Sequence, residues 1–257
     1  MNLPVLWHIP VSHYNEKVRW TLDLKGIEHE RRAPTPPAHM AVARWLTRGR
    51  ANTFPLLVLD GQAIADSTAI IAALERRHPD PPLYPEDPVQ RERALELEEF
   101  FDEELGPQVR LLAFHELRQD AEARSAFAAI LLPGPLAANA TVRRVAGLGA
   151  SAYANARYRV SSDDAAAHAR AKVVAALDRL EAELDRGGGE YLVGDSFSIA
   201  DLTAASLFVP VVMPPEGPEL PDPAGPYQAF RESLRDRPGY RWVADVFARH
   251  RAAARRP

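Results

Sequence analysis

The sequence predicts an α/β domain over residues 1–78, a linker over 79–87 and an all-α helical bundle over 88–257. In the first part, short apolar runs alternate with helical patterns, and the tight-turn pair Asp60-Gly61 separates two apolar runs as in a β-hairpin. The segment from His78 to Pro85 then places four prolines in eight residues, which no helix can continue through, and helical periodicity prevails beyond it. A chain of 257 residues is long enough for two domains with cores of their own.

The first domain is expected to hold a βαβ unit, a hairpin and a closing helix. Its first apolar run is typical of a buried strand, and the helical spacing that follows stops at Gly26. Prolines at 34, 36 and 37 suit no regular element. In chain order the expected elements are a strand at 5–9, a helix at 15–25, a strand at 28–32, a short helix within 38–47, strands at 56–59 and 62–65, and a helix at 67–77.

Helical patterns dominate the second domain. A strongly charged helix is expected over 89–104, and Gly106-Pro107 should bend or break it before helical spacing resumes over 109–117. Residues 119–162 are less predictable, because Gly147 and neighbouring breakers weaken an alanine-rich stretch. This segment is interpreted either as an elaboration that faces the substrate or as an ordinary variable insertion.

The last third of the chain carries clearer helix signals. A helix over 165–184 is expected to start at a Ser162-Asp163-Asp164 cap and to stop at a run of glycines. Ser198 and Asp201 form a capping box that begins the next helix, so Asp201 is interpreted as structural. A final amphipathic helix contains residues 242–247.

Composition and charge exclude several classes of function. A net charge of −4 and a pI near 6.1 give no electrostatic attraction to nucleic acid, and the basic stretch 249–256 is expected to be a solvated tail. No apolar run approaches the length that crosses a bilayer, and the N-terminus lacks the basic flank of a signal peptide. We therefore expect a cytoplasmic protein with neither a nucleic-acid nor a membrane partner.

The chain contains no cysteine. This excludes disulfides, thiolate metal sites and a thiol nucleophile from the protein itself. Any sulfur that takes part in a reaction must arrive on a cosubstrate.

Residues 52–70 combine three recognition devices. Pro55 opens a strand, where a missing N–H does least harm, and in the cis form it would turn the free backbone groups of Phe54 outward. After the hairpin, Asp66 and Ser67 stand where a helix begins. Their oxygens and the free N–H groups of the first turn suit the charged ends of a small zwitterion.

Together with Ser12-His13-Tyr14-Asn15-Glu16-Lys17-Val18-Arg19 upstream and Gly194-Asp195-Ser196-Phe197-Ser198-Ile199-Ala200-Asp201 downstream, this segment resembles the cytosolic glutathione S-transferase superfamily, as a serine-type, bacterial-like member. The resemblance spans most of the chain. It implies a thioredoxin-like N-terminal domain that binds glutathione as cosubstrate and a helical C-terminal domain that forms the acceptor-substrate pocket, which together make the glutathione transferase fold.

The resemblance also implies which residues hold glutathione. Phe54 and Pro55 match the segment that binds the cysteinyl backbone, and Asp66 followed by Ser67 matches the pair that binds the γ-glutamyl end. Asp66 is one methylene shorter than the glutamate often found there. His39 is a candidate for the glycyl carboxylate.

Three residues near the start of the first helix are candidates for activating the glutathione thiol. A hydroxyl that donates to sulfur and the positive end of a helix both lower the pKa of a thiol from about 8.5. Ser12 matches the residue that serine-type relatives use, while Asn15 and Tyr14 also carry groups that donate to sulfur. Ser12 as a plain helix cap and His8 as a base at the end of the first strand remain alternatives.

The acceptor pocket is expected to be lined by Leu111, Phe114 and His115 after the bend at Pro107, with Tyr14 across the cleft. The sequence contains no metal-binding motif, and no metal is expected.

The expected function is a transferase that activates the glutathione thiol for attack on a small, largely apolar electrophile. Alternatives are a glutathione-dependent isomerase or dehalogenase, a non-catalytic ligand- or partner-binding member of the fold, and the use of another low-molecular-weight thiol. The resemblance also implies a homodimer.

Overall fold

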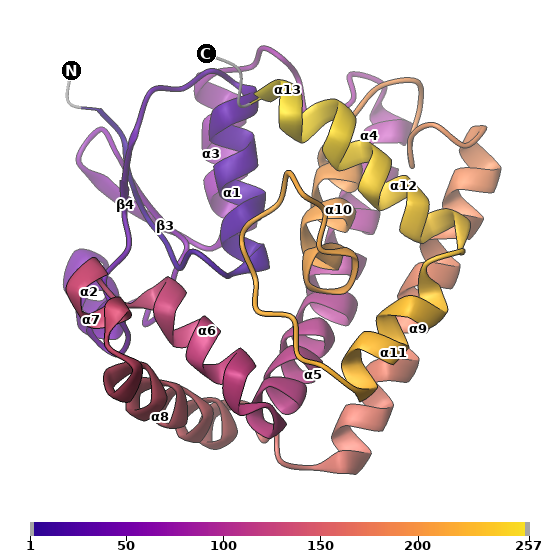
Figure 1. Ribbon diagram of the computed structural model, residues 1–257. Helices are drawn as coiled ribbons and strands as arrows, with labels where there is room; N and C mark the ends of the chain where they lie inside the picture. Colours follow the sequence, from indigo (N-terminus) through magenta and orange to yellow (C-terminus); the bar gives the residue numbers. More distant parts are fainter. Residues whose placement is uncertain (1–2, 255–257) are drawn as a thin grey trace.

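The computed structural model describes residues 3–254, which fold into an α/β part and a helical part (Figure 1). The α/β part contains a four-stranded sheet in the order β2-β1-β3-β4. Strand β1 runs parallel to β2 and antiparallel to β3, and β3 and β4 form the predicted hairpin. The strands are β1 (Val5–Trp7), β2 (Glu30–Arg32), β3 (Leu56–Leu59) and β4 (Gln62–Ala65).

Side chains that alternate along the strands bury both faces of this sheet. On one face, Leu6 and Leu57 pack against helices α1 (His13–Leu24) and α3 (Ser67–Arg77). On the other face, Leu56 packs with Phe54 against α2 (Ala38–Leu46). A sheet covered on both sides leaves its connecting loops as the place for a binding site.

Helix α1 begins at His13, two residues before the predicted start. The reason is the cap: Ser12 has extended backbone angles, and its Oγ accepts a hydrogen bond from the Asn15 N–H at 3.4 Å. His13 and Tyr14 therefore belong to the first helical turn, and Ser12 is the last residue before it.

The helical part is built around α10 (Ile199–Val212), in which every residue is buried. Its N-terminus has the predicted capping box, and the Asp201 carboxylate also accepts the Leu192 N–H at 2.8 Å. The other helices of this part are α4 (Pro88–Phe100), the π-helical segment η1 (Phe101–Leu105), α5 (Gly106–Gln119), α6 (Ala121–Leu131), α7 (Gly134–Ala138), α8 (Ala140–Tyr158), α9 (Asp163–Gly187), α11 (Pro226–Leu234), α12 (Pro238–Val246), the π-helical segment η2 (Phe247–Arg251) and α13 (Ala252–Ala254).

Gly106-Pro107 does not break the helix as predicted. The helix instead changes from α to π and back to α at this point. Segment η1 joins α4 to α5 without a loop, and the Gly106 N–H bonds to the Phe101 carbonyl in the i→i−5 pattern. Pro107 then occupies the first turn of α5, where a missing N–H leaves no bond unmade.

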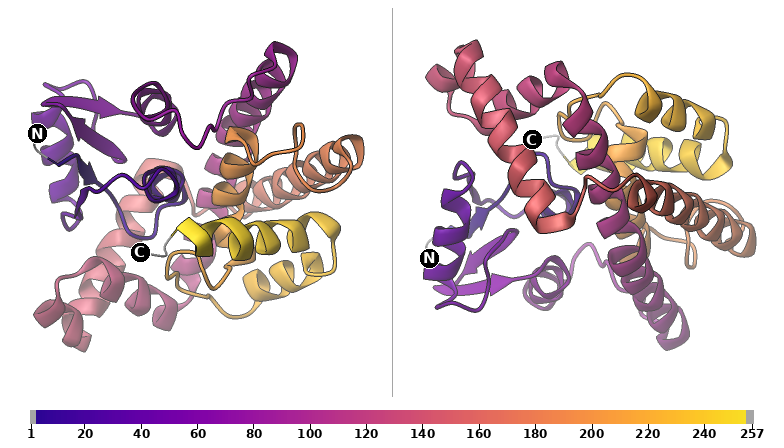
Figure 2. Two further views of the ribbon diagram at one scale, coloured as in Figure 1. Left: turned by 90° about the horizontal axis from the view of Figure 1, so that it is seen from above. Right: turned by 90° about the horizontal axis from the view of Figure 1, so that it is seen from below.

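Residues 119–162 are more regular than the sequence indicates, because they form α6, α7 and α8. Gly147 does not break α8 but lets it approach α6 closely, since a Cβ at Gly147 would lie 2.8 Å from the Arg124 carbonyl oxygen. Viewed from above and below, these helices stand beside the α/β part and away from α11 and α12 (Figure 2).

The C-terminal stretch is not the solvated tail that its basic residues suggest. Arg249 pairs with Asp245 and Glu190, and the side chain of Arg251 is fully buried against α1. Arg255 and Arg256 lie outside the described residues. Within residues 3–254 no helix combines the length and the hydropathy needed to span a bilayer.

Candidate active site

A cavity of about 1030 Å³ separates the loops of the α/β part from helices α5, α6 and α8. One side is formed by the turn before α1, the loops around α2 and the start of α3. The opposite side is formed by aromatic and aliphatic side chains of the helical part. The cavity thus has a polar wall and an apolar wall, with the N-terminus of α1 between them.

The residues expected to hold glutathione all border the polar wall: Phe54, Pro55, Asp66, Ser67 and His39. The Phe54–Pro55 peptide bond is cis, and Phe54 precedes β3, outside the sheet register. The backbone groups of Phe54 are therefore not used in the strand ladder.

Asp66 caps α3, and its Oδ1 accepts the Ala69 N–H at 3.1 Å. Its φ of 78° is rare for a residue other than glycine. Such conformations persist where the surrounding structure holds them, often beside a functional site. The cap role and a ligand role are compatible, because the first turn of α3 still offers free N–H groups to the cavity.

His39 is 4% exposed, and its Nδ1 has no hydrogen-bond partner within residues 3–254. Burial lowers the pKa of His39, which favours a neutral ring. A neutral imidazole suits a hydrogen bond to a ligand better than it suits an ion pair with a carboxylate.

Ser12 borders the cavity at the N-terminus of α1. Its Oγ accepts the Asn15 N–H, and no acceptor for its hydroxyl hydrogen exists among the described residues. The hydroxyl can therefore donate to a group placed in the cavity. The partial positive charge of the helix terminus acts at the same point.

Tyr14 also borders the cavity, but its hydroxyl is engaged. It donates to the Asp102 carbonyl at 2.7 Å, and burial raises the pKa of Tyr14 above its ordinary value. Its ring fills the space beside Gly106, where a Cβ would lie 2.2 Å from the Tyr14 oxygen. Tyr14 therefore joins the two parts of the fold and shapes the cavity wall, while its hydroxyl hydrogen points to a backbone carbonyl.

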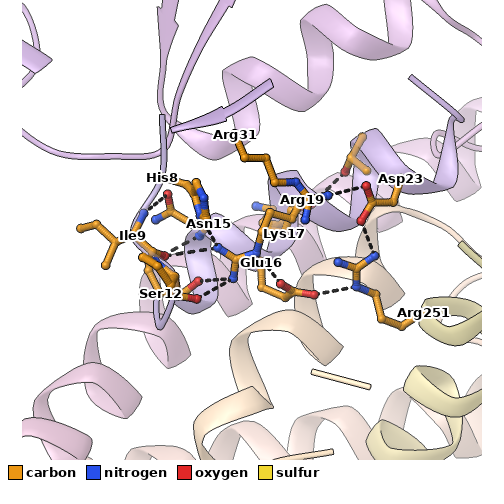
Figure 3. Close-up of polar contacts among 12 residues, drawn as sticks. His8, Ile9, Ser12, Asn15, Glu16, Lys17, Arg19, Asp23, Arg31 and Arg251 are labelled. Carbon is orange, nitrogen blue, oxygen red and sulfur yellow. Dashed lines mark hydrogen bonds and ion pairs between the residues drawn. The ribbon is translucent and has the colours of Figure 1, made fainter. Parts of the chain in front are cut away.

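Two other candidates for thiol activation lie away from the cavity. Asn15 is fully buried and does not line it, and its Oδ1 accepts the Ile9 N–H at 3.2 Å (Figure 3). His8 does not line it either, and its Nδ1 lies 3.0 Å from Nη1 of Arg19. Burial, together with the charge of Arg19, lowers the pKa of His8 to about 4, so the ring is neutral and accepts from Arg19. The Asn15 side chain thus holds the backbone of the loop before Ser12, while the His8 ring contacts Arg19.

The acceptor side corrects part of the sequence prediction. Phe114 lines the cavity, but Leu111 and His115 do not. Leu111 packs in the cluster around Leu112, and the His115 ring bonds to the Val160 carbonyl at 2.7 Å. The helix register explains the error, since the residues of α5 that face the cavity recur at Pro107, Arg110, Ala113, Phe114 and Leu117.

This wall also contains residues that the sequence did not indicate, among them Phe127, Tyr158 and Arg110. Phe127 on α6 and Tyr158 at the end of α8 supply aromatic surface around Phe114, with ring centroids 5.7 and 6.0 Å away. Arg110 lies over the rings of Tyr158 at 4.5 Å and Tyr14 at 5.7 Å. Helical spacing places Arg110 on the same face of α5 as Pro107, whereas no local pattern marks Phe127 or Tyr158.

Arg110 makes no ion pair with any residue of the described chain, and its Nε is buried without a partner. Asp102, an acid that borders the cavity, is already paired with Lys17 at 2.7 Å. Glu103, a second such acid, is exposed. The cavity therefore contains a cation without a fixed counter-ion. No group of acidic and histidine residues suited to a metal ion occurs within residues 3–254.

Comparisons with known families match both parts of the chain. The family model described as "Glutathione S-transferase, N-terminal domain" matches residues 6–82, and that described as "Glutathione S-transferase, C-terminal domain" matches residues 163–249. Residues 83–162, which include α5, α6 and α8, lie between the two matches.

Individual proteins are similar to this chain over most of its length. A probable maleylacetoacetate isomerase of Caenorhabditis elegans is 28% identical over 204 residues, which are 79% of this chain and 77% of the relative. A glutathione S-transferase from Methylobacillus flagellatus with GSH bound has a similar structure, with 17% identity, a TM-score of 0.61 and 98% of each chain covered. A maleylacetoacetate isomerase from Anaeromyxobacter dehalogenans with bound dicarboxyethyl glutathione and citrate also has a similar structure. It is 22% identical, with a TM-score of 0.57, and the match covers 99% of this chain and 96% of that chain. At these identities, the structural matches establish the fold.

Two histidines near Ser12, the buried His13 and the partly buried His8, predict a pH-dependent stability. Burial lowers the pKa of His8 to about 4 and that of His13, which bonds to the Gly106 carbonyl, to about 3. Both titrate near 6.5 in the unfolded chain, so the unfolded state binds more protons below that pH. We expect the free energy of unfolding to be unaffected by these groups above pH 6.5. It should fall by up to about 1.4 kcal/mol per histidine per pH unit as the pH drops toward 4.

Urea unfolding at a series of pH values checks this prediction. His8→Gln and His13→Gln should each flatten the pH dependence between 4 and 6.5, whereas His168→Gln, at an exposed position of α9, should not. Equal slopes in all four proteins would contradict the assignment of a neutral ring to His8 and to His13.

Proposed function

We propose that this chain, which belongs to the glutathione S-transferase superfamily, activates the thiol of glutathione for attack on a small, largely apolar electrophile. The proposed location is the cytoplasm. The observation that carries the proposal is that Ser12, at the N-terminus of α1, borders the same cavity as Phe54, Asp66 and Ser67. Recovery of the chain in the membrane fraction of its cells would contradict the proposed location.

In the proposed complex, glutathione lies along the polar wall. The free backbone groups of Phe54 pair with its cysteinyl residue, and Asp66 and the first turn of α3 receive its γ-glutamyl end. The sulfur then reaches the start of α1. There the Ser12 hydroxyl donates to it and the helix terminus stabilises its negative charge, so the pKa of the thiol falls below about 8.5.

The electrophile occupies the apolar wall formed by Phe114, Phe127 and Tyr158. The thiolate sulfur forms a bond to the electrophilic carbon, and the leaving group departs with the electrons of the bond that breaks. The thiol proton is released to solvent before attack. The protein's own groups bind and orient the two reactants and stabilise the thiolate.

Ser12→Ala tests the proposal directly. We expect kcat/KM for glutathione and a neutral aryl halide such as chlorodinitrobenzene to fall by about 100-fold, the scale of losing one donor to a developing anion. Tyr14→Phe is the matched control: it removes a nearby hydroxyl that already donates to the Asp102 carbonyl, and we expect a loss of less than about threefold.

Circular dichroism should accompany the kinetics, because Ser12 also caps α1 and its loss lowers stability by about 1 kcal/mol. Full activity in folded Ser12→Ala would rule out Ser12 as the activator. Glutathione binding by calorimetry without turnover in the wild type would instead favour a non-catalytic binding protein. If the protein bound another small thiol but not glutathione, that thiol would be the cosubstrate instead.

A second candidate function is glutathione-dependent isomerisation of an unsaturated carboxylic acid. Both isomerase relatives described above are named for maleylacetoacetate, and addition followed by elimination of the thiolate at one carbon would suit the same site. The observation that favours it is the guanidinium of Arg110, which has a buried Nε and no ion pair among the described residues. A substrate carboxylate would supply the missing partner.

The Arg110→Met variant separates the two functions. We expect kcat/KM for isomerisation of a cis-unsaturated dicarboxylate such as maleate to fall by about 10- to 100-fold, whereas conjugation of neutral chlorodinitrobenzene changes by less than about threefold. Lys172→Met removes one positive charge at an exposed ion pair with Glu104, outside the cavity, and should leave both rates unchanged. Equal effects of Arg110→Met on the two substrates would contradict recognition of an anion.

We also propose that the protein is a homodimer, as the superfamily resemblance implies. Exposed apolar side chains support this, among them Val89 on α4, which is 75% exposed, and Trp45 on α2, which is 76% exposed. Light scattering at micromolar concentration should give twice the chain mass of 28.4 kDa. A monomer mass would contradict the dimer.

A further inference from the structure

The backbone that carries Ser12 is held by a buried arginine whose role the proposed mechanism does not include (Figure 3). Residues 8–12 connect β1 to α1. Arg19, from the second turn of α1, reaches back and donates from Nη2 to the carbonyls of Pro10 at 3.0 Å and of Ser12 at 3.3 Å. Its Nη1 donates to the Ile9 carbonyl at 3.2 Å. One guanidinium thus fixes the path of this loop and the position of Ser12 at its end.

Arg19 is in turn held by Glu16, a fully buried carboxylate one turn earlier on the same helix. Oε2 of Glu16 lies 2.7 Å from Nε of Arg19. The other oxygen, Oε1, lies 2.6 Å from Nε of Arg251, which belongs to η2 at the opposite end of the chain. Each oxygen of the carboxylate therefore has its own arginine, and neither can move without disturbing the other.

Arg251 is placed for this contact by two further interactions. Its Nη1 lies 2.7 Å from Oδ2 of Asp23, which stands on the same face of α1 as Glu16, seven residues later. Its guanidinium also lies 5.9 Å from the ring of Trp20. Although burial opposes it, hydrogen bonds from Arg251 and Arg31 hold the pKa of Asp23 below its ordinary value, so this second anchor is charged.

Stability alone is a weak reason for such a network. Removing charges from water offsets most of the attraction between them, and well-packed apolar side chains often serve a fold equally well. Nη2 of Arg251 has no hydrogen-bond partner within residues 3–254, and burying an unpaired donor costs further free energy. What the network provides is a fixed position for Arg19.

We propose that Arg251 and Glu16 are positioning residues, which act through Arg19 to hold the Ser12 loop in the geometry that activates glutathione. The proposal rests on the function proposed above. It means that η2, the penultimate element of the described chain, helps to set the reactivity of a site at the N-terminus of α1. A displacement of Ser12 by a fraction of an ångström is enough to weaken a hydrogen bond aimed at sulfur.

The test compares Arg251→Met with Arg249→Met. Both remove one arginine from η2, but Arg249 is partly exposed and pairs with Asp245 and Glu190, away from the loop. We expect kcat for chlorodinitrobenzene to fall by about 10-fold or more in Arg251→Met, with KM for glutathione within about threefold, because the glutathione-binding groups lie on other elements. The pH–rate profile should shift to higher pH in the same variant. Arg249→Met should match the wild type.

Two more variants separate positioning from general destabilisation. Arg251→Lys keeps one cation but not the two-pronged contact with Glu16 and Asp23, and it should recover part of the lost kcat. Trp242→Phe on α12 removes a hydrogen bond to the Glu190 carbonyl in the same C-terminal region without touching the network, and it should leave kcat and the pH profile unchanged. An unchanged profile in folded Arg251→Met, or the same shift in Trp242→Phe, would overturn the proposal.

Amide hydrogen exchange gives a readout that does not depend on catalysis. The Ile9 N–H donates to the Asn15 side chain, and the Ser12 N–H donates to the Ile9 carbonyl. Both N–H groups should exchange at least about 10-fold faster in Arg251→Met than in Arg249→Met. Equal exchange in the two variants would refute the positioning role. Faster exchange in Arg251→Met, together with a wild type that never reacts with glutathione, would support the role of the network in holding the loop. It would refute the proposed function instead.

Discussion

Helix α1 is buried between the sheet and the helical part, and it can be so only because its polar side chains find partners. Lys17, with no exposed surface, lies 3.0 Å from Glu98 and 2.7 Å from Asp102, so α1 is joined to α4 and η1 by ion pairs. An unpaired charge at that depth would be strongly unfavourable. These pairings fix the rotation of α1, and the rotation brings Ser12 to the cavity and turns Asn15 away from it.

The two walls of the cavity have different origins in the chain. The polar wall comes from residues within the matched N-terminal family region, and its geometry follows from a cis-proline turn and two helix N-termini. The apolar wall comes largely from α5, α6 and α8, which lie outside both family matches. In the proposed function, the residues that hold glutathione therefore lie in the matched N-terminal region, whereas the wall that receives the acceptor, with Arg110, Phe127 and Tyr158, lies outside both matches.

Sequence reasoning succeeded where a signal is local. The hairpin, the cap at Asp66 and the capping box at Asp201 each follow from a few adjacent residues, and the structure contains all three. It failed where the outcome depends on helix rotation or on distant contacts. A start of α1 two residues early moves Asn15 off the cavity, and the rotation of α5 exchanges His115 for Arg110. The burial of Arg251 depends on Glu16, 235 residues away, which no local pattern reveals.

In the proposed function, the start of α1 stabilises a thiolate. Titrating the ultraviolet absorbance of the thiolate of glutathione bound to the wild-type protein tests it most directly, since no second substrate is needed. We expect the bound thiol to ionise with a pKa at least about one unit below the ordinary value near 8.5. A bound thiol that ionises at or above that value would contradict it, whatever rate the protein shows with an electrophile.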